Sequence, residues 1–422
     1  MNVNADLALG NSARRGGDGF GRRLARWALW VFLTFHFDAG AVGLRLPNQD
    51  PEAIARGNAF AATADNPSAI YYNPAGITQL EGQSIQAGVY FLSTGIDYES
   101  ATGARARTDS SLRPVPQLYY VNSLEAVPIS FGLGVYVPYG LALDWGEDNP
   151  FRTLVQEGEL LYLCFNPVVA WAVHPALSIG IGPTINYSEA SLTRGVLVAG
   201  DQFEFEGDGV AYGFNAGARW APHPKWALGL NYRYLTTVEY QGDADVDLLF
   251  PEPVSLSSSA SAEIRFPQFV VAGVSFRPTD KWNLEVNIDW TDWDNLNEIV
   301  LSGVPGGDQQ VLLNYRSSWM YEFGVTRKLG RGYSLSGGYF FSENSSPDRN
   351  FTPLVPDSDL HLGSVGLSYR GERWRWAAAY HFGYNSGRTV SGSESGSLVG
   401  ETGDGTYRVL NHAFNVSAAI QF

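Results

Sequence analysis

From about residue 84 to the C-terminus, the chain repeats short runs in which apolar and polar residues alternate. In Trp282–Trp290, every second residue is apolar, and the residues between them are Asn, Glu or Asp. Leu410–Phe422 shows the same alternation. Successive side chains of a strand point to opposite faces, so each run forms a strand with one apolar and one polar face. Such runs at regular spacing predict an all-β fold, either a barrel or a sandwich.

The lengths of the connections favour the barrel. We predict fourteen strand cores, with boundaries good to a few residues. The cores are 84–93, 113–122, 129–138, 160–173, 177–190, 209–221, 226–240, 265–277, 281–294, 316–328, 333–342, 360–370, 373–385 and 406–422. Short turns such as His174-Pro175-Ala176 alternate with long loops such as 241–264. Short turns at one rim and long loops at the other are typical of outer-membrane barrels, so residues 84–422 predict an antiparallel transmembrane β-barrel.

Two segments precede the predicted barrel. Residues 1–41 carry a basic stretch, then the apolar run Trp27–Phe37, then Ala39-Gly40-Ala41. This order is typical of a secretory signal peptide, and eleven apolar residues are too few to span a membrane. Residues 42–83 are rich in Ala, Asn and Pro and show no alternation, so we treat them as a separate N-terminal part.

Composition agrees with a membrane barrel and excludes other classes. Charged residues make up 17% of the chain, against about 25% in ordinary globular proteins. The net charge of −15 argues against nucleic-acid binding, which needs cations against phosphates. The single cysteine, Cys164, rules out an intrachain disulfide. Neither a metal-binding nor a catalytic motif is found, so we expect no enzyme activity, no cofactor and no metal.

Several segments resemble the FadL/TodX family, whose members are outer-membrane porins for long-chain fatty acids and aromatic hydrocarbons. Ala64–Ile77 contains Asn73-Pro74-Ala75, which is similar to an Asn-Pro-Ala element at the N-terminal part of that family. Gly132–Gly140, the Phe266-Pro267 region and the Ser346–Asp359 region resemble later parts of the family in the same order. The C-terminal Phe422 resembles the signal by which the barrel-assembly machinery recognises such chains.

The resemblance implies a fourteen-stranded barrel in which residues 42–83 fold into the lumen as a hatch. Ligand would bind at an outer groove, move to an internal pocket and leave sideways through the wall near the third strand. The implied partners are hydrophobic small molecules and outer-membrane lipid, and the implied state is a monomer. Asn73, Pro74 and Ala75 would then fix the hatch, although the same residue types also form ordinary turns.

Two further groups are candidates for ligand passage. Gly132, Gly134 and Pro138 can break the wall beside the hatch, because glycine weakens a strand and proline cannot donate to its ladder. A simple strand end is the alternative. The second group, in the long loop 241–264, is a candidate outer hydrophobic patch; the alternative is a loop folded on its own centre. Its residues are Leu248, Leu249 and Phe250.

Charged residues in the predicted strands supply the remaining candidates. Three acids are expected to face the lumen, either against the hatch or as solvated wall residues; they are Glu285, Asp289 and Glu322. A fatty-acid carboxylate would need a cation there. The candidates are Arg219, Arg233 and Arg265.

The expected function is passive passage of hydrophobic compounds such as long-chain fatty acids across the outer membrane. Transport of aromatic hydrocarbons and a structural or adhesive barrel are the alternatives, together with a general aqueous porin. The segment 42–83 discriminates between them, since a plain barrel has no use for it.

Overall fold

The structure is a computed structural model that describes residues 44–249, 251–394, 397 and 399–422. These residues belong to one compact unit, Asp38–Phe422. The predicted signal peptide, residues 1–41, lies outside the described residues. Within them, no helix has the length and apolarity that crossing a membrane requires.

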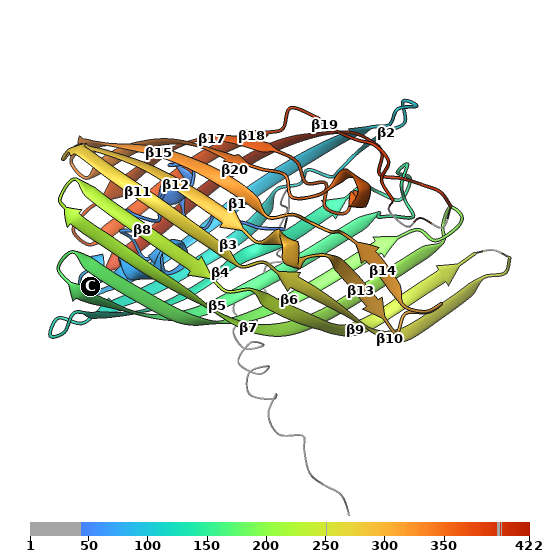
Figure 1. The fold of residues 1–422 in the computed structure, drawn as a ribbon, viewed down its shortest axis with the longest axis horizontal. Helices are drawn as coiled ribbons and strands as arrows, with labels where there is room; N and C mark the ends of the chain where they lie inside the picture. The colour runs from blue at the N-terminus through green and yellow to red at the C-terminus, as the bar shows by residue number, and fades with distance from the viewer. Residues whose placement is uncertain (1–43, 250, 395–396, 398) are drawn as a thin grey trace, which may run out of the picture. The chain divides into compact units, whose positions relative to one another are not determined.

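Fourteen antiparallel wall strands, three of them interrupted, close into a barrel over the described part of the chain (Figure 1). The uninterrupted strands are β1 (Gln83–Glu99), β3 (Arg113–Ser123), β4 (Ile129–Asp144), β5 (Glu157–His174), β6 (Leu177–Arg194), β7 (Gln202–His223), β15 (Ser318–Gly330), β16 (Tyr333–Ser342), β17 (Leu360–Arg370), β18 (Trp374–Tyr384) and β20 (Gly405–Gln421). The interrupted strands are β8 (Trp226–Arg233) with β9 (Thr236–Leu248), β10 (Val254–Phe266) with β11 (Phe269–Thr279), and β12 (Trp282–Thr291) with β13 (Glu298–Ser302). The barrel closes where β1 pairs with β20, from Ser84 opposite Gln421 to Glu99 opposite Thr406.

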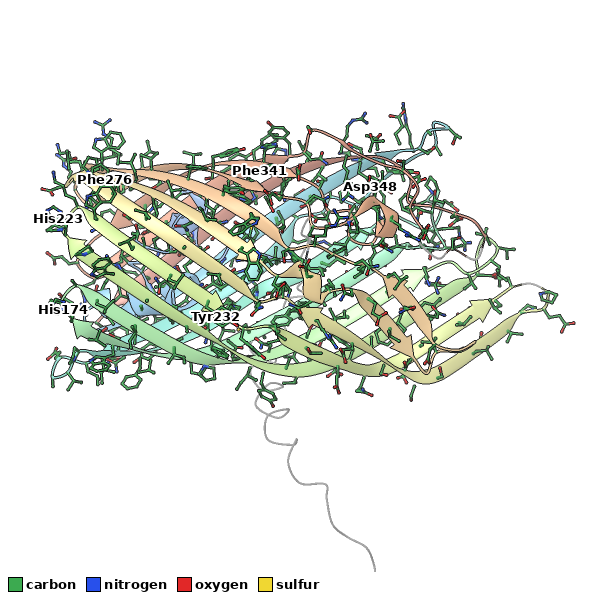
Figure 2. All side chains as sticks on the ribbon, in the orientation of Figure 1. His174, His223, Tyr232, Phe276, Phe341 and Asp348 are labelled. Atoms are coloured by element: carbon green, nitrogen blue, oxygen red, sulfur yellow. The ribbon has the colours of Figure 1, made fainter. Side chains whose placement is uncertain are left out.

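The predicted rims are confirmed. Short turns, among them those that carry His174 and His223, lie together at one end of the barrel (Figure 2). The long connections lie at the other end and hold five short elements. These are β2 (Arg105–Arg107), η2 (Trp293–Asn295), β14 (Gln309–Leu312), η3 (Asp348–Asn350) and β19 (Arg388–Val390).

The prediction of an irregular loop over 241–264 is wrong. Strands β9 and β10 continue through it as a hairpin, paired from Thr236 opposite Phe266 to Leu248 opposite Val254. The sequence does alternate here, since buried Ala244 and Val246 lie between the exposed acids of β9. The acids favour a loop prediction because the apolar residues between them are small and few.

The direction of the two strand faces shows that this is a membrane barrel and not a soluble sandwich. On β12, Trp282, Leu284, Val286 and Ile288 are 39–46% exposed. On the opposite face, Glu285, Asn287 and Asp289 are buried and Asn283 is half-buried. A soluble strand hides its apolar face, whereas a strand in lipid turns that face outward and its polar face toward the lumen.

The interior is filled by the N-terminal segment, which we define as residues 44–82. It contains α2 (Pro51–Ile54), α3 (Ala69–Tyr72) and η1 (Pro74–Gln79). From residue 44 to residue 80, every residue is buried except Pro47, Asp65, Thr78 and Gln79. A short irregular segment can be buried so completely only when other parts of the chain surround it and satisfy its backbone groups.

Candidate functional site: the barrel interior

Polar side chains of the wall bond to the backbone of the N-terminal segment. The Glu285 carboxylate accepts hydrogen bonds from the backbone N–H of Ala62 at 2.7 Å and of Thr63 at 3.1 Å. Asn215 Nδ2 donates to the carbonyl of Ile70 at 2.8 Å, and Asn231 Nδ2 donates to that of Tyr71 at 3.2 Å. These bonds replace water for backbone groups that regular structure leaves unpaired, so the lumen holds the segment in one conformation.

Asn73 joins the segment to the wall at the start of η1. Its side-chain oxygen accepts from Ala75 N at 3.2 Å and caps the helix, while Pro74 occupies the first helical position. Its Nδ2 donates to the carbonyl of Ala61 at 2.8 Å and to that of Ala218 in β7 at 3.0 Å. One side chain therefore caps a helix, bridges two parts of the segment and binds the wall.

Glycines of the wall let the segment approach the strands closely. A Cβ on Gly229 would lie 2.1 Å from the carbonyl oxygen of Ala61, and one on Gly338 would lie 2.0 Å from Gly57 N. Other wall glycines show similar contacts under 3.0 Å with the segment. They are Gly132, Gly134, Gly180, Gly217, Gly324 and Gly366. At Gly180, Gly229, Gly324 and Gly338 the wall lies against the backbone of the segment, and at the other four glycines it lies against side chains of the segment.

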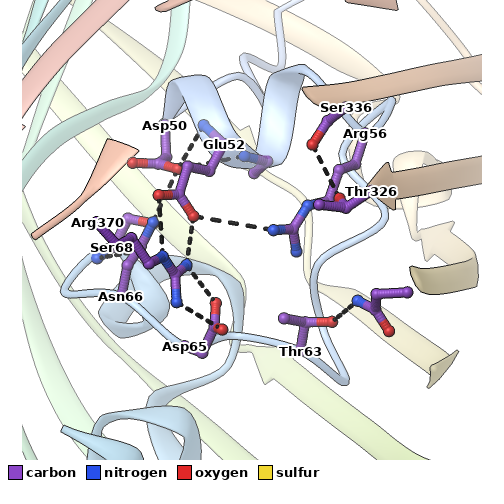
Figure 3. A network of polar contacts seen from close by, with 12 residues as sticks. Asp50, Glu52, Arg56, Thr63, Asp65, Asn66, Ser68, Thr326, Ser336 and Arg370 are labelled. Atoms are coloured by element: carbon purple, nitrogen blue, oxygen red, sulfur yellow. Dashed lines mark hydrogen bonds and ion pairs between the residues drawn. The ribbon is translucent and has the colours of Figure 1, made fainter. Parts of the chain in front are cut away.

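An ion-pair network fixes the other side of the segment (Figure 3). Arg370 of β17 contacts Glu52 of α2 at 2.5 Å and Asp65 at 2.8 Å. Burial by itself would raise the pKa of Asp65, but the Arg370 guanidinium holds it well below its ordinary value. Burial and the charge of Glu52 raise the pKa of Asp50, the N-cap of α2, to about 6.

Arg45 forms the main ion pair of the lumen. Its two Nη atoms donate to the two carboxylate oxygens of Asp289 at 2.8 and 2.7 Å, and Nη1 also donates to Thr291 Oγ1. The guanidinium carbon lies 3.7 Å from the ring centroid of Phe269. Burial by itself would lower the pKa of Arg45, but the Asp289 charge raises it above its ordinary value, so Arg45 stays a cation.

Arg45 lines two cavities. The larger has about 470 Å³ of non-atom space, part of it open to solvent, and Trp293, Tyr315 and Val355 contribute to its walls. The smaller has about 270 Å³ of non-atom space, also partly open, and lies against Tyr71 and Phe269. Arg45 is the lining residue that the two cavities share.

The wall itself is incomplete between β3 and β4. These strands pair only from Leu118 opposite Val135 to Ser123 opposite Ser130, although β4 continues to Asp144. Residues of the N-terminal segment take the missing place: Leu46 N donates to the carbonyl of Pro138 at 2.8 Å, and Gly140 N donates to that of Leu44 at 2.9 Å. The gap in the ladder is thus covered by the start of the described chain.

Proline explains why the ladder stops there. Ser123 N donates to the carbonyl of Gly82 next to β1, so the odd-numbered residues of β3 face β1 and the even-numbered residues face β4. Pro114 and Pro116 are even-numbered and offer β4 no N–H. Pro138 also faces the gap, since its carbonyl accepts from Leu46, and a bulge in the pairing with β5 lies beside it. Both edges therefore lack donors where they would meet.

With this geometry described, comparisons with known proteins give the family. Residues 34–422 match the model of the outer membrane protein transport protein family (OMPP1/FadL/TodX). The chain belongs to the FadL/TodX family. Its members are outer-membrane channels and not enzymes, which agrees with the fold and with an outer-membrane location.

Individual FadL/TodX proteins are distant relatives. The long-chain fatty acid transport protein of Salmonella typhi is 19% identical over 78% of this chain and 84% of its own length. The structure of a Pseudomonas aeruginosa FadL homologue has a TM-score of 0.81 at 18% identity, covering 90% of this chain and all of that one. The Pseudomonas putida toluene transporter TodX has a TM-score of 0.73 at 17% identity, covering 92% and 99%. At these identities the structures establish a shared fold.

The candidates for the lateral opening and for the outer hydrophobic patch lie in different parts of this FadL/TodX chain. Gly132 and Gly134 lie in the paired part of β4, where a Cβ on either would lie within 3.0 Å of Ile70 in α3. Leu248 ends β9 and Leu249 is exposed beside Gly200, whereas Phe250 lies outside the described residues. These leucines therefore lie at the tip of a strand hairpin.

Two of the three arginine candidates face the lumen, and neither is free. Arg219 Nε donates to the carbonyl of Ala62 at 2.9 Å, and Arg233 donates to the hydroxyl of Tyr136. The expectation that Arg265 lies inside is wrong, because it is exposed and pairs with Glu263. Sequence reasoning missed Arg45, which precedes the strands and carries no periodic signal.

Proposed function

We propose that the protein takes up hydrophobic compounds passively, with the N-terminal segment acting as a hatch and with release sideways between β3 and β4. Long-chain fatty acids and aromatic hydrocarbons are the two substrate classes in the printed names of its relatives. The observation that carries the proposal is the incomplete ladder, whose β4 edge is covered by residues 44–46 together with the side chain of Gln49. An apolar ligand that passes there enters lipid without crossing water.

The structure of the hatch supports a moving part. Residues 44–46 contact β4 through edge hydrogen bonds, whereas Asn73 and the Arg370 network fix the rest of the segment. Arg45 also pairs with Asp289, so these residues leave β4 only if that pair moves with them or breaks, while η1 and α2 stay in place. We propose that Asn73, Pro74 and Ala75 form the fixed part and that Pro138 marks the opening.

A reversible cross-link tests this passage. Leu44 and Gly140 lie opposite each other at the bridge between Arg45 and Tyr139, so cysteines at positions 44 and 140 are placed to form a disulfide. In cells that lack other channels of this kind, we expect the intact protein to speed uptake of labelled hydrophobic compounds. The oxidised Leu44→Cys/Gly140→Cys variant should lose that uptake, and a reductant should restore it.

Two controls make the result specific. The Gly140→Cys single variant should transport normally under oxidising conditions. Ion conductance in salt solution and uptake of sugars distinguish the channel filled by the hatch from an aqueous porin, which would pass both. Unchanged uptake through the cross-linked protein would refute the lateral route, and uptake no faster than in cells without the protein would refute the transport function.

A further inference from the structure

The two cavities that Arg45 lines contain more acidic residues than cations. Glu343 and Asp357 line the larger cavity, and Asp289 and Glu322 line the smaller one. Among the described residues that line either cavity, Arg45 is the one cation. Any ligand that moves between the cavities passes this set of groups.

The charge of Arg45 is already compensated. Asp289 binds it with two parallel hydrogen bonds, and the two side chains are 6% and 2% exposed. This fork-to-fork geometry is the strongest that a guanidinium and a carboxylate can form. A ligand carboxylate would have to displace Asp289 and leave that buried charge without a partner, which is costly.

The larger cavity adds carboxyl groups but no second cation. The Asp357 carboxyl group accepts hydrogen bonds from Ser345 N, from Ser345 Oγ and from Ser358 N, while its burial raises its pKa. Arg388, which contacts the backbone of Asp357, is occupied by Asp348 at 2.7 Å and does not line the cavity. An anionic ligand would therefore meet no free cation here.

The same cavity suits an uncharged guest. Trp293 and Tyr315 stack edge to face at 6.1 Å, beside Leu44 and Val355. The buried Tyr315 hydroxyl and Nε of Arg45 have no hydrogen-bond partner among the described residues. A neutral molecule with a hydroxyl or carbonyl oxygen can satisfy these groups, while its apolar body meets the aromatic rings.

From this charge balance we infer that the channel selects uncharged hydrophobic molecules over carboxylate anions, so that a fatty acid is carried as its protonated acid. The inference rests on the proposed function and specifies its substrate class. The Arg45–Asp289 pair determines this selectivity, because Asp289 already neutralises the guanidinium charge and leaves no free cation for a ligand carboxylate.

A matched pair of ligands tests the inference. Decanol and decanoate share one chain and differ in charge. Binding is measured with the full chain in lipid nanodiscs, with empty nanodiscs subtracted, at a pH well above the ordinary carboxyl pKa. Decanol should bind more tightly by on the order of tenfold, as expected for one unfavourable charge interaction at partly buried distances. Decanoate binding should strengthen as the pH falls toward its own pKa, while decanol binding stays constant.

One substitution should change the preference. Asp289→Asn keeps the size of the side chain and an acceptor for Arg45, but leaves the cation uncompensated. Decanoate affinity should then rise by about tenfold. Asp280→Asn, in the short exposed turn before β12, makes the same change of charge outside the cavities and should alter neither affinity.

The outcomes separate the two claims. Equal binding of decanol and decanoate by the intact protein, or an Asp289→Asn variant that gains no decanoate affinity, overturns the selectivity and leaves the transport function standing. Binding of neither ligand above empty nanodiscs overturns the proposed function itself. Retained decanol binding by Asp289→Asn shows that the variant is folded.

Discussion

At the scale of single residues, glycine decides how closely the N-terminal segment fits the wall. Gly338 on β16 lies where any side chain would overlap the backbone of Gly57, whereas a Cβ on Gly363 of the adjacent β17 would meet open space. Gly363 lies opposite Tyr339 on the outward face of the wall, away from the N-terminal segment. The two glycines therefore differ in the face of the wall on which they lie.

This contrast gives a prediction. Gly338→Ala places a methyl group where the backbone of Gly57 lies, so the N-terminal segment should pack less firmly, at a cost of about 1–3 kcal/mol. Limited proteolysis in membranes should cut residues 44–82 faster in this variant than in the wild type. The matched Gly363→Ala variant should behave like the wild type, and equal proteolysis of both variants would contradict the close packing.

At the scale of elements, β3 and β4 differ from the other neighbouring strands of the wall. Three prolines, Pro114, Pro116 and Pro138, remove donors from the two facing edges, and the chain before α2 supplies the missing hydrogen bonds. An unpaired strand edge is a template for another strand. Residues 44–46 use it, and in our proposal a ligand passes when they leave.

Restoring the donors should therefore close the gap. In the Pro114→Val/Pro116→Val variant, β3 can extend its pairing toward Val137 and compete with residues 44–46. Uptake of hydrophobic compounds should fall, while decanol binding in the lumen stays unchanged. A Pro175→Ala variant, in a short turn far from the gap, is the control. Undiminished uptake in the double variant would argue against this route.

At the scale of the whole molecule, the wall turns apolar side chains outward, whereas a soluble protein buries them. This inversion makes the effect of a charge depend on its depth in the membrane. On β12, Val286 lies in the middle of the exposed apolar face and Trp282 lies beside the short turn. Both are apolar and exposed, so a soluble protein would tolerate a charge at either position.

The membrane predicts a different result. Val286→Arg should lower the free energy of unfolding by about 2–4 kcal/mol, and Trp282→Arg should cost at most about 1 kcal/mol, since interfacial charges reach water. Denaturant titration of the protein folded in lipid vesicles measures both. Equal costs at the two positions would mean that β12 does not cross the bilayer.

The sequence by itself determined the barrel. Two patterns predict it: the alternation within Trp282–Trp290, and the alternation of short turns such as His174-Pro175-Ala176 with long connections. Both patterns involve residues that are close in the sequence, so one sequence is enough to show them. The sequence also located the fourteen strand cores and the lumen-facing acids, which follow from the two-residue period of a strand and from turn chemistry. The Asn73-Pro74-Ala75 element was found only through its resemblance to the FadL/TodX family.

Tertiary structure decided what fills the barrel and how it is held. Arg45 and Asp289 are 244 residues apart, and the sequence around each residue gives no sign that they form an ion pair. The acidic run of β9 forms a hairpin with β10, and its small residues are buried. Arg265 lies on the outward face of β10 and is exposed. Contacts between remote parts of a chain depend on closure of the barrel, which no local pattern records.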